Sequence, residues 1–243
     1  IYDADDDSDI PFTATDAATD TLVLPAEKKL IVWTGKTFAP AGNITVNSGG
    51  SGNAWDGSLE VQTGATLTAA GTQSHAVGGS FTLGTSATFA SASSTVTLTA
   101  TTTGKTIHPQ TSSFYNLVFN GVGGNWSFAS GNATTTGDIT ITNGTLTLPS
   151  GTLSVAGSFD NSGGTIMHNN GTVYLTALVT GKNVRTNGSN LYNLTMNGTG
   201  GGWSFLDTNA TTSNNFTLTV GSTTLPAGIF AVGGSFANTG TFN

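Results

Sequence analysis

The stretch GDITITNGTLTLPSGTLSVAG, residues 137–157, consists of three blocks of seven residues, and each block opens with glycine. After the glycine, polar and apolar side chains alternate. Because successive side chains of a β-strand point to opposite sides, the apolar ones point one way and the threonines the other. The blocks SFDNSG, GTIMHNN and GTVYLTA continue the series to residue 177. The sequence therefore predicts a series of short strands, each with one buried side.

These strands lack the partner pattern of hairpins and follow one another at a near-constant spacing, as the sides of a coil do. Three of them complete a coil of roughly 20 residues, and stacking the coils in parallel buries the apolar side of each strand. We predict an all-β fold, a parallel β-solenoid. The side chains expected to point inward are Leu146, Leu148, Leu153, Val155, Val173, Leu175, Trp126 and Trp203, and those expected to point outward are Thr140, Thr142, Thr145 and Thr147.

A longer repeat contains these blocks. Residues 104–163 align without a gap on residues 181–240, at an offset of 77, and a weaker copy precedes them. The solenoid body, 27–243, is thus divided into repeats at about 27–103, 104–180 and 181–243. A 77-residue repeat holds eleven strands of seven residues, which is not a multiple of three, so the number of coils per repeat stays open. The alternative fold is an antiparallel sandwich, which the Asn-Gly dipeptides at 120–121, 143–144, 170–171, 187–188 and 197–198 favour.

Charge is sparse and concentrated at the start of the chain. Only 8% of the residues are charged, against about 25% in ordinary globular domains. The seven aspartates from Asp3 to Asp20 account for the whole net charge of −7, and six acids and six bases remain after them. A neutral body with so few bases does not provide the basic track that nucleic acids require. The chain contains no cysteine and no apolar run long enough to span a membrane, so we expect neither disulfides nor membrane insertion.

The phrases TGDITITNGTLTLPSGTLSVAGSFDNSGGTI (136–166) and YNLTMNGTGGGWSF (192–205) resemble repeats of very large bacterial surface proteins and of filamentous-haemagglutinin-type adhesins. The resemblance covers roughly residues 57–243, and residues 1–56 match it poorly. It implies a right-handed parallel β-helix displayed outside the cell. The chain begins with Ile1 rather than Met, which fits removal of a leader and fits a part of a longer chain equally well. We expect a secreted protein at the cell surface.

Residues 1–26 form an acidic segment in front of this body. Asp3, Asp5, Asp7 and Asp9 alternate with other residues, as the oxygen ligands of calcium sites do. The run departs from the EF-hand loop, because its sixth position is Ser8 and its twelfth is Ala14. Two interpretations stay open, a solvated acidic tail and a calcium site.

Catalytic residues are harder to find. Polysaccharide lyases and hydrolases need two or three carboxylates close together, yet the only carboxylates from residue 61 on are Asp138, Asp160 and Asp207, and none recurs in the other copy. His75, His108 and His168 are widely spaced, and we expect them at the surface or in turns. Trp126 and Trp203 follow glycine-rich turns, where a sugar-binding platform would expose them, but the alternation favours burial. We therefore expect a protein that is not an enzyme and has no cofactor, with calcium as the exception.

The leading hypothesis is an extracellular structural protein, a subunit or segment of a surface fibre, filament or surface layer. The alternative is an adhesin or carbohydrate-binding module on the same scaffold, with host or matrix glycans as partners. For the first hypothesis we expect copies to associate head to tail. The apolar runs Leu22-Val23-Leu24 and Leu30-Ile31-Val32-Trp33 would then serve as docking strands for a neighbouring copy.

Overall fold

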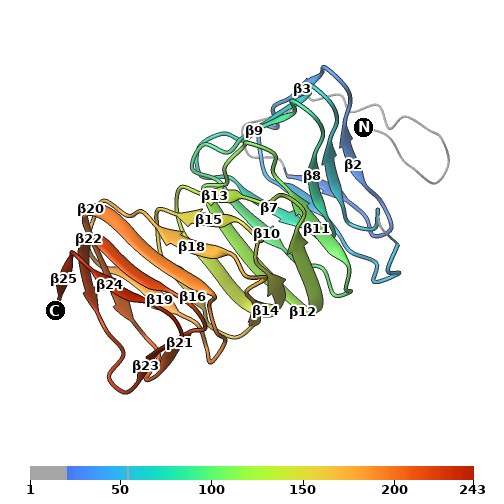
Figure 1. Cartoon of the computed structure of the whole chain (residues 1–243). Coiled ribbons are helices and arrows are strands. Elements are labelled where there is room, and N and C mark those ends of the chain that lie inside the picture. The colour runs from blue at the N-terminus through green and yellow to red at the C-terminus, as the bar shows by residue number, and fades with distance from the viewer. Residues whose placement is uncertain (1–20, 54) are drawn as a thin grey trace.

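The computed structural model describes residues 21–53 and 55–243. Within them the chain forms strands β1 to β25 and no helix. All the strand pairings found there are parallel. Figure 1 shows the result, an elongated stack that runs in sequence order from β2 and β3 at one end to β25 at the other. The predicted parallel β-solenoid is confirmed, and the antiparallel sandwich is excluded.

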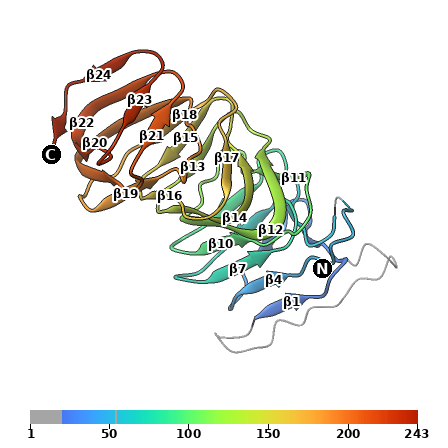
Figure 2. The same ribbon diagram turned by 90° about the horizontal axis from the view of Figure 1, so that it is seen from below.

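The chain winds around three faces, and each face is a column of parallel strands. Four strands near the N-terminus show the principle in Figure 2, where β1, β4, β7 and β10 lie in succession. The first face consists of β1 (Leu22–Leu24), β4 (Ile44–Val46), β7 (Ser74–Val77), β10 (Thr95–Leu98), the start of β12 (Asn116–Phe128), the start of β14 (Ile139–Thr147), β16 (Phe159–Asn161), β19 (Lys182–Arg185), the end of β20 (Asn193–Phe205), the end of β22 (Phe216–Thr224) and β25 (Thr241–Phe242). These eleven segments correspond to about ten turns of the solenoid.

The other two faces are built in the same way. The second face consists of β2 (Leu30–Val32), β5 (Leu59–Val61), β8 (Phe81–Leu83), β11 (Lys105–His108), the ends of β12 and β14, β17 (Thr165–Met167), β21 (Ala210–Thr212) and β23 (Phe230–Val232). The third face consists of β3 (Thr37–Phe38), β6 (Thr66–Thr68), β9 (Thr88–Ala90), β13 (Ala133–Thr135), β15 (Thr152–Val155), β18 (Thr172–Leu175), the starts of β20 and β22, and β24 (Phe236–Asn238).

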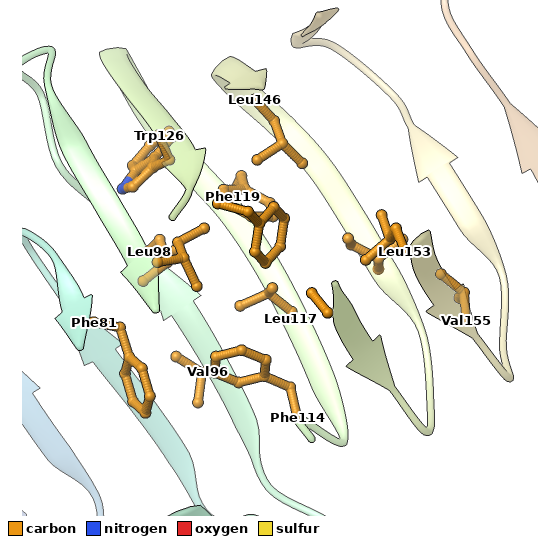
Figure 3. Close-up of a cluster of buried hydrophobic side chains, with 14 of the residues drawn as sticks. Phe81, Val96, Leu98, Phe114, Leu117, Phe119, Trp126, Leu146, Leu153 and Val155 are labelled. Carbon is orange, nitrogen blue, oxygen red and sulfur yellow. The ribbon is translucent and has the colours of Figure 1, made fainter. Parts of the chain in front are cut away.

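The inward side chains form one continuous core along the stack. In Figure 3, Val96 and Leu98 of β10 lie beside Leu117 and Phe119 of β12, which are their partners in the parallel register. All eight side chains predicted to point inward are buried, and the four threonines predicted to point outward are exposed or half-exposed. The alternation in the sequence therefore gives the register correctly, since a slip of one residue would have exchanged the two sets.

The 77-residue repeat corresponds to eleven strand segments. From Leu117 on the first face, the chain passes through eleven successive segments before it reaches the equivalent residue, Leu194. Since three segments complete a coil, the repeat spans three and two-thirds coils. Leu194 accordingly lies on the third face, opposite Val173, whereas Leu117 lies opposite Ile139 on the first. Each repeat is thus rotated by one face relative to the preceding repeat.

Polar side chains at the starts of strands connect successive coils. Asn116 Oδ1 accepts a hydrogen bond from the N–H of Asp138 (2.9 Å), and Asp138 Oδ1 accepts one from the N–H of Ser158 (2.7 Å). In the next repeat Asn193 Oδ1 accepts one from the N–H of Asn215 (3.2 Å). Such bonds satisfy backbone donors at the corners, where the strand ladder is interrupted. Asn116 and Asn193 therefore hold successive coils together.

Both apolar runs expected to dock on a neighbour lie within the stack of their own chain. Leu22–Leu24 is β1, which pairs with β4, and Leu30–Val32 is β2, which pairs with β5. Their inward side chains Leu24, Leu30 and Val32 are buried in the common core. These two segments therefore form the first coil of the described stack, and a contact of this coil with another copy stays a prediction.

Candidate functional site

The aspartates proposed to hold calcium, Asp3, Asp5, Asp7 and Asp9, lie outside the described residues. Residues 21–53 and 55–243 contain no group of three or more His, Asp or Glu side chains that could hold a metal ion. The calcium site therefore stays a prediction from the sequence. In the described part of the chain, no helix is long and apolar enough to cross a membrane.

The three carboxylates of the later repeats lie apart and contact structural partners. Asp138 accepts the corner hydrogen bond described above, and Lys182 Nζ lies 4.0 Å from its Oδ1. Asp160 Oδ1 lies 3.4 Å from Nε of Arg185, its partner on the next coil of the first face. Asp207 Oδ2 accepts hydrogen bonds from the N–H and the hydroxyl of Thr186 (2.5 and 3.1 Å). Each of these carboxylates connects neighbouring coils, and the structure does not bring them together.

His75 is not at the surface, contrary to expectation. It points into the core from β7, is 3% exposed, and its Nδ1 accepts a hydrogen bond from the N–H of Ile44 (3.1 Å). Burial lowers the pKa of His75 to about 4, because the charged imidazolium loses its hydration in the core. The imidazole is therefore neutral at pH 7 and occupies an apolar position. His108 and His168 are half-exposed, as expected.

Trp126 and Trp203 are buried, and glycines make room for their indole rings. A Cβ atom on Gly124 would lie 2.5 Å from Cη2 of Trp126, and one on Gly201 would lie 2.8 Å from Cη2 of Trp203. The glycine-rich phrases before each tryptophan thus allow close packing inside the core. These two rings are not a sugar-binding platform. The other two tryptophans, Trp33 and Trp55, are 45% and 40% exposed.

The corner between β4 and β5 was not recognised from the sequence as a candidate site. We call its residues 47–53 and 55–57 the corner segment. Its anchor is Asp56, which is completely buried. The Asp56 carboxylate accepts hydrogen bonds from the N–H groups of Glu27 (3.0 Å), Gly49 (2.7 Å) and Gly50 (2.9 Å) and from the hydroxyl of Ser48 (3.3 Å).

These hydrogen bonds decide the charge state of Asp56. Burial alone raises the pKa of this carboxyl group, but the hydrogen bonds from Gly49, Glu27, Gly50 and Ser48 outweigh burial, and the pKa lies below its ordinary value. Asp56 is therefore a charged anchor that fixes the base of the corner segment.

A second anchor comes from a more distant part of the chain. Lys105 at the start of β11 is 2% exposed, and its Nζ donates a hydrogen bond to the carbonyl oxygen of Asn53 (3.0 Å). The equivalent lysine of the next repeat, Lys182, has no such segment above it, and its side chain is 28% exposed. The comparison indicates that the corner segment is what buries Lys105.

No family model matches this chain, and searches of curated proteins and of solved structures found no match to it. The class of protein is therefore defined by the fold. The chain is a β-solenoid repeat protein, consistent with the β-helix repeat proteins, built from stacked parallel coils at a spacing of about 21 residues.

Proposed function

We propose that the chain is an extracellular structural protein, a segment or subunit of a surface fibre, filament or surface layer. The observation that supports this most directly is the direction of the hydrogen bonds and ion pairs. Backbone hydrogen bonds, the corner bonds of Asn116 and its equivalents, and cross-coil ion pairs such as Asp160–Arg185 all run from one coil to the next. These interactions lie along the axis of the stack, where they resist extension and bending of a rod.

Exposed aromatic side chains in the last described coil are consistent with a fibre that grows by adding coils. In the last described coil Phe236 and Phe242 are 51% and 37% exposed, and their rings lie 5.8 Å apart. A further coil with the same register would bury them, as Phe216 is buried beneath Phe236. We propose that a further coil covers these rings, from the same polypeptide or from a second copy in a head-to-tail contact, and that a contact of the second kind generates a filament rather than a closed dimer.

Sedimentation of the 243-residue chain at micromolar concentration tests this contact. We expect a concentration-dependent series of elongated species, and Phe236→Asp should shift it towards the monomer. A monomer that stays stable and soluble over the whole concentration range would contradict head-to-tail assembly. An adhesive function on the same scaffold is the second candidate, and the corner segment is the observation that favours it.

A further inference from the structure

The corner segment is an insertion that the stack does not need. Thr45 pairs with Ala76 at a sequence separation of 31, whereas Ala76 pairs with Thr97 at a separation of 21. The difference, 31 minus 21, leaves ten positions beyond those needed for one coil. The longest connection in this coil is the one between β4 and β5, at the corner between the first and second faces.

The corner segment lies over the two coils that follow it. A Cβ on Gly78 would lie 2.4 Å from the backbone nitrogen of Ser48, and one on Gly79 would lie 2.3 Å from the carbonyl oxygen of Asp56. These glycines let the segment pack directly against the corner of the next coil. The hydrogen bond from Lys105 to Asn53 then reaches the coil after that. The segment is thus held from two coils.

Ordering this segment costs free energy, which the hydrogen bonds to Asp56 and from Lys105 offset in part. A segment of Gly, Ser and Asn loses much conformational entropy when it is ordered, and burying Asp56 and Lys105 removes two charges from water. The later coils, which have shorter connections, are complete without such a segment. Segments held on a rigid scaffold are where proteins commonly place recognition residues.

The corner segment presents an aromatic ring among neutral polar groups. Trp55 is 40% exposed, and Ser51, Gly52 and Asn53 before it are exposed. No charged residue occurs between positions 47 and 55. An indole face packs well against the C–H face of a pyranose ring, while hydroxyl, amide and backbone groups around it satisfy the sugar hydroxyls. Charged side chains approach the segment from its neighbours: the buried Lys105 ammonium bonds the Asn53 carbonyl, and the Glu27 carboxylate lies against Gly49. The exposed residues 51–53 and Trp55 carry no charge themselves, which favours a neutral sugar over a charged one.

We propose that the corner segment is a recognition loop that binds a neutral saccharide, with the ring of Trp55 as its stacking platform. This function goes beyond a structural role and does not depend on filament formation. Asp56 and Lys105 are positioning residues, because they hold the loop and do not contact the sugar. Trp126 and Trp203 take no part, since they are buried in the core.

The test uses the full chain on an array of neutral oligosaccharides: β-glucans, mannans, galactans and N-acetylglucosamine oligomers. We expect binding to at least one class, a change of tryptophan fluorescence on titration, and a loss of affinity of at least tenfold in Trp55→Ala. The matched control is Trp33→Ala, which removes the other half-exposed tryptophan and should bind like the parent.

Three results would overturn the proposal. One is the absence of binding to every neutral class on the array, and another is equal binding by the parent and Trp55→Ala. The third is capture of a protein partner that depends on Trp55 while no oligosaccharide binds. A further variant, Asp56→Asn, should weaken sugar binding and open the loop to limited proteolysis while the solenoid stays folded. Sugar binding unchanged in this variant would contradict the positioning role of Asp56.

Discussion

Trp126 and Trp203 occupy the same position in the 77-residue sequence repeat but lie on different faces of the solenoid. Trp126 is on the second face, opposite Lys105 and Leu146, whereas Trp203 is on the first, opposite Lys182 and Thr223. The cause is the length of the repeat, which spans three and two-thirds coils. A feature carried by the repeat is therefore displayed on each face in turn, and it returns to the same face only after three repeats. The repeat does not specialise one side of the rod.

Leu148→Asp should destabilise the solenoid strongly. Leu148 is buried in the core, and a carboxylate there would have no partner, which costs about 3–5 kcal/mol. Urea unfolding measured by circular dichroism gives the difference. Thr147→Asp, at the adjacent outward position, serves as the control and should change stability little. If Leu148→Asp and the parent unfold at the same urea concentration, Leu148 does not point into the core.

Gly124→Ala should destabilise the protein because there is no room for a methyl group beside the indole ring. The new Cβ would lie 2.2 Å from the carbonyl oxygen of Ala100 and 2.5 Å from Trp126 Cη2. We expect a loss of roughly 1–3 kcal/mol. Gly131→Ala is the matched control, since nothing lies within 4 Å of its Cβ position, and it should be nearly neutral. If the two variants unfold at the same urea concentration, glycine is not needed for packing Trp126.

Stability should fall on mild acidification because of His75. The pKa of His75 is about 4 in the folded state, against an ordinary value of 6.5. As the pH falls, the imidazole is therefore protonated at a higher pH in the unfolded chain than in the folded one. The stabilisation is therefore present above pH 6.5 and is lost as the pH falls towards 4, by about 2 kcal/mol between pH 7 and pH 5. Urea unfolding at both pH values measures this loss. His75→Leu should remove most of it, and an unchanged pH dependence in this variant would rule His75 out as its origin.

We expect no hydrolase or lyase activity on polysaccharides. Asp138, Asp160 and Asp207 contact partners on neighbouring coils and are not brought together. Reducing-end and unsaturated-product assays on plant, algal and bacterial polysaccharides provide the measurement. Turnover that disappears when one of these residues is changed to asparagine would show that the protein is an enzyme.

The seven-residue period of the sequence predicts the fold because each block repeats the same alternation of polar and apolar side chains. Alternation over strands such as Ile139–Thr147 fixes which side is buried, and the glycines fix the corners. Leu146 and Leu153 could therefore be assigned to the core from the sequence. The face on which each 77-residue repeat begins could not be assigned from the sequence. It depends on how many strands complete a coil, and no single residue encodes that number.

The candidate site was harder to predict from the sequence than the fold. Asp56 and Lys105 are far apart along the chain, and only the stacking of coils brings both to the corner segment. One signal was present: the regular spacing of strands is interrupted between Val46 and Leu59. The alternation did carry a signal for His75, because Val77 two residues later points to the same side, but a titratable side chain at an inward position was not expected.

Electron microscopy of the protein in its native material is the most direct test of the proposed structural role. We expect fibres, filaments or a surface layer built from these rods, with an axial repeat of about 4.8 Å from the stacked strands. Antibody labelling of the chain should decorate these assemblies along their length. Dispersed single molecules, with the label absent from every extended assembly, would contradict the structural role.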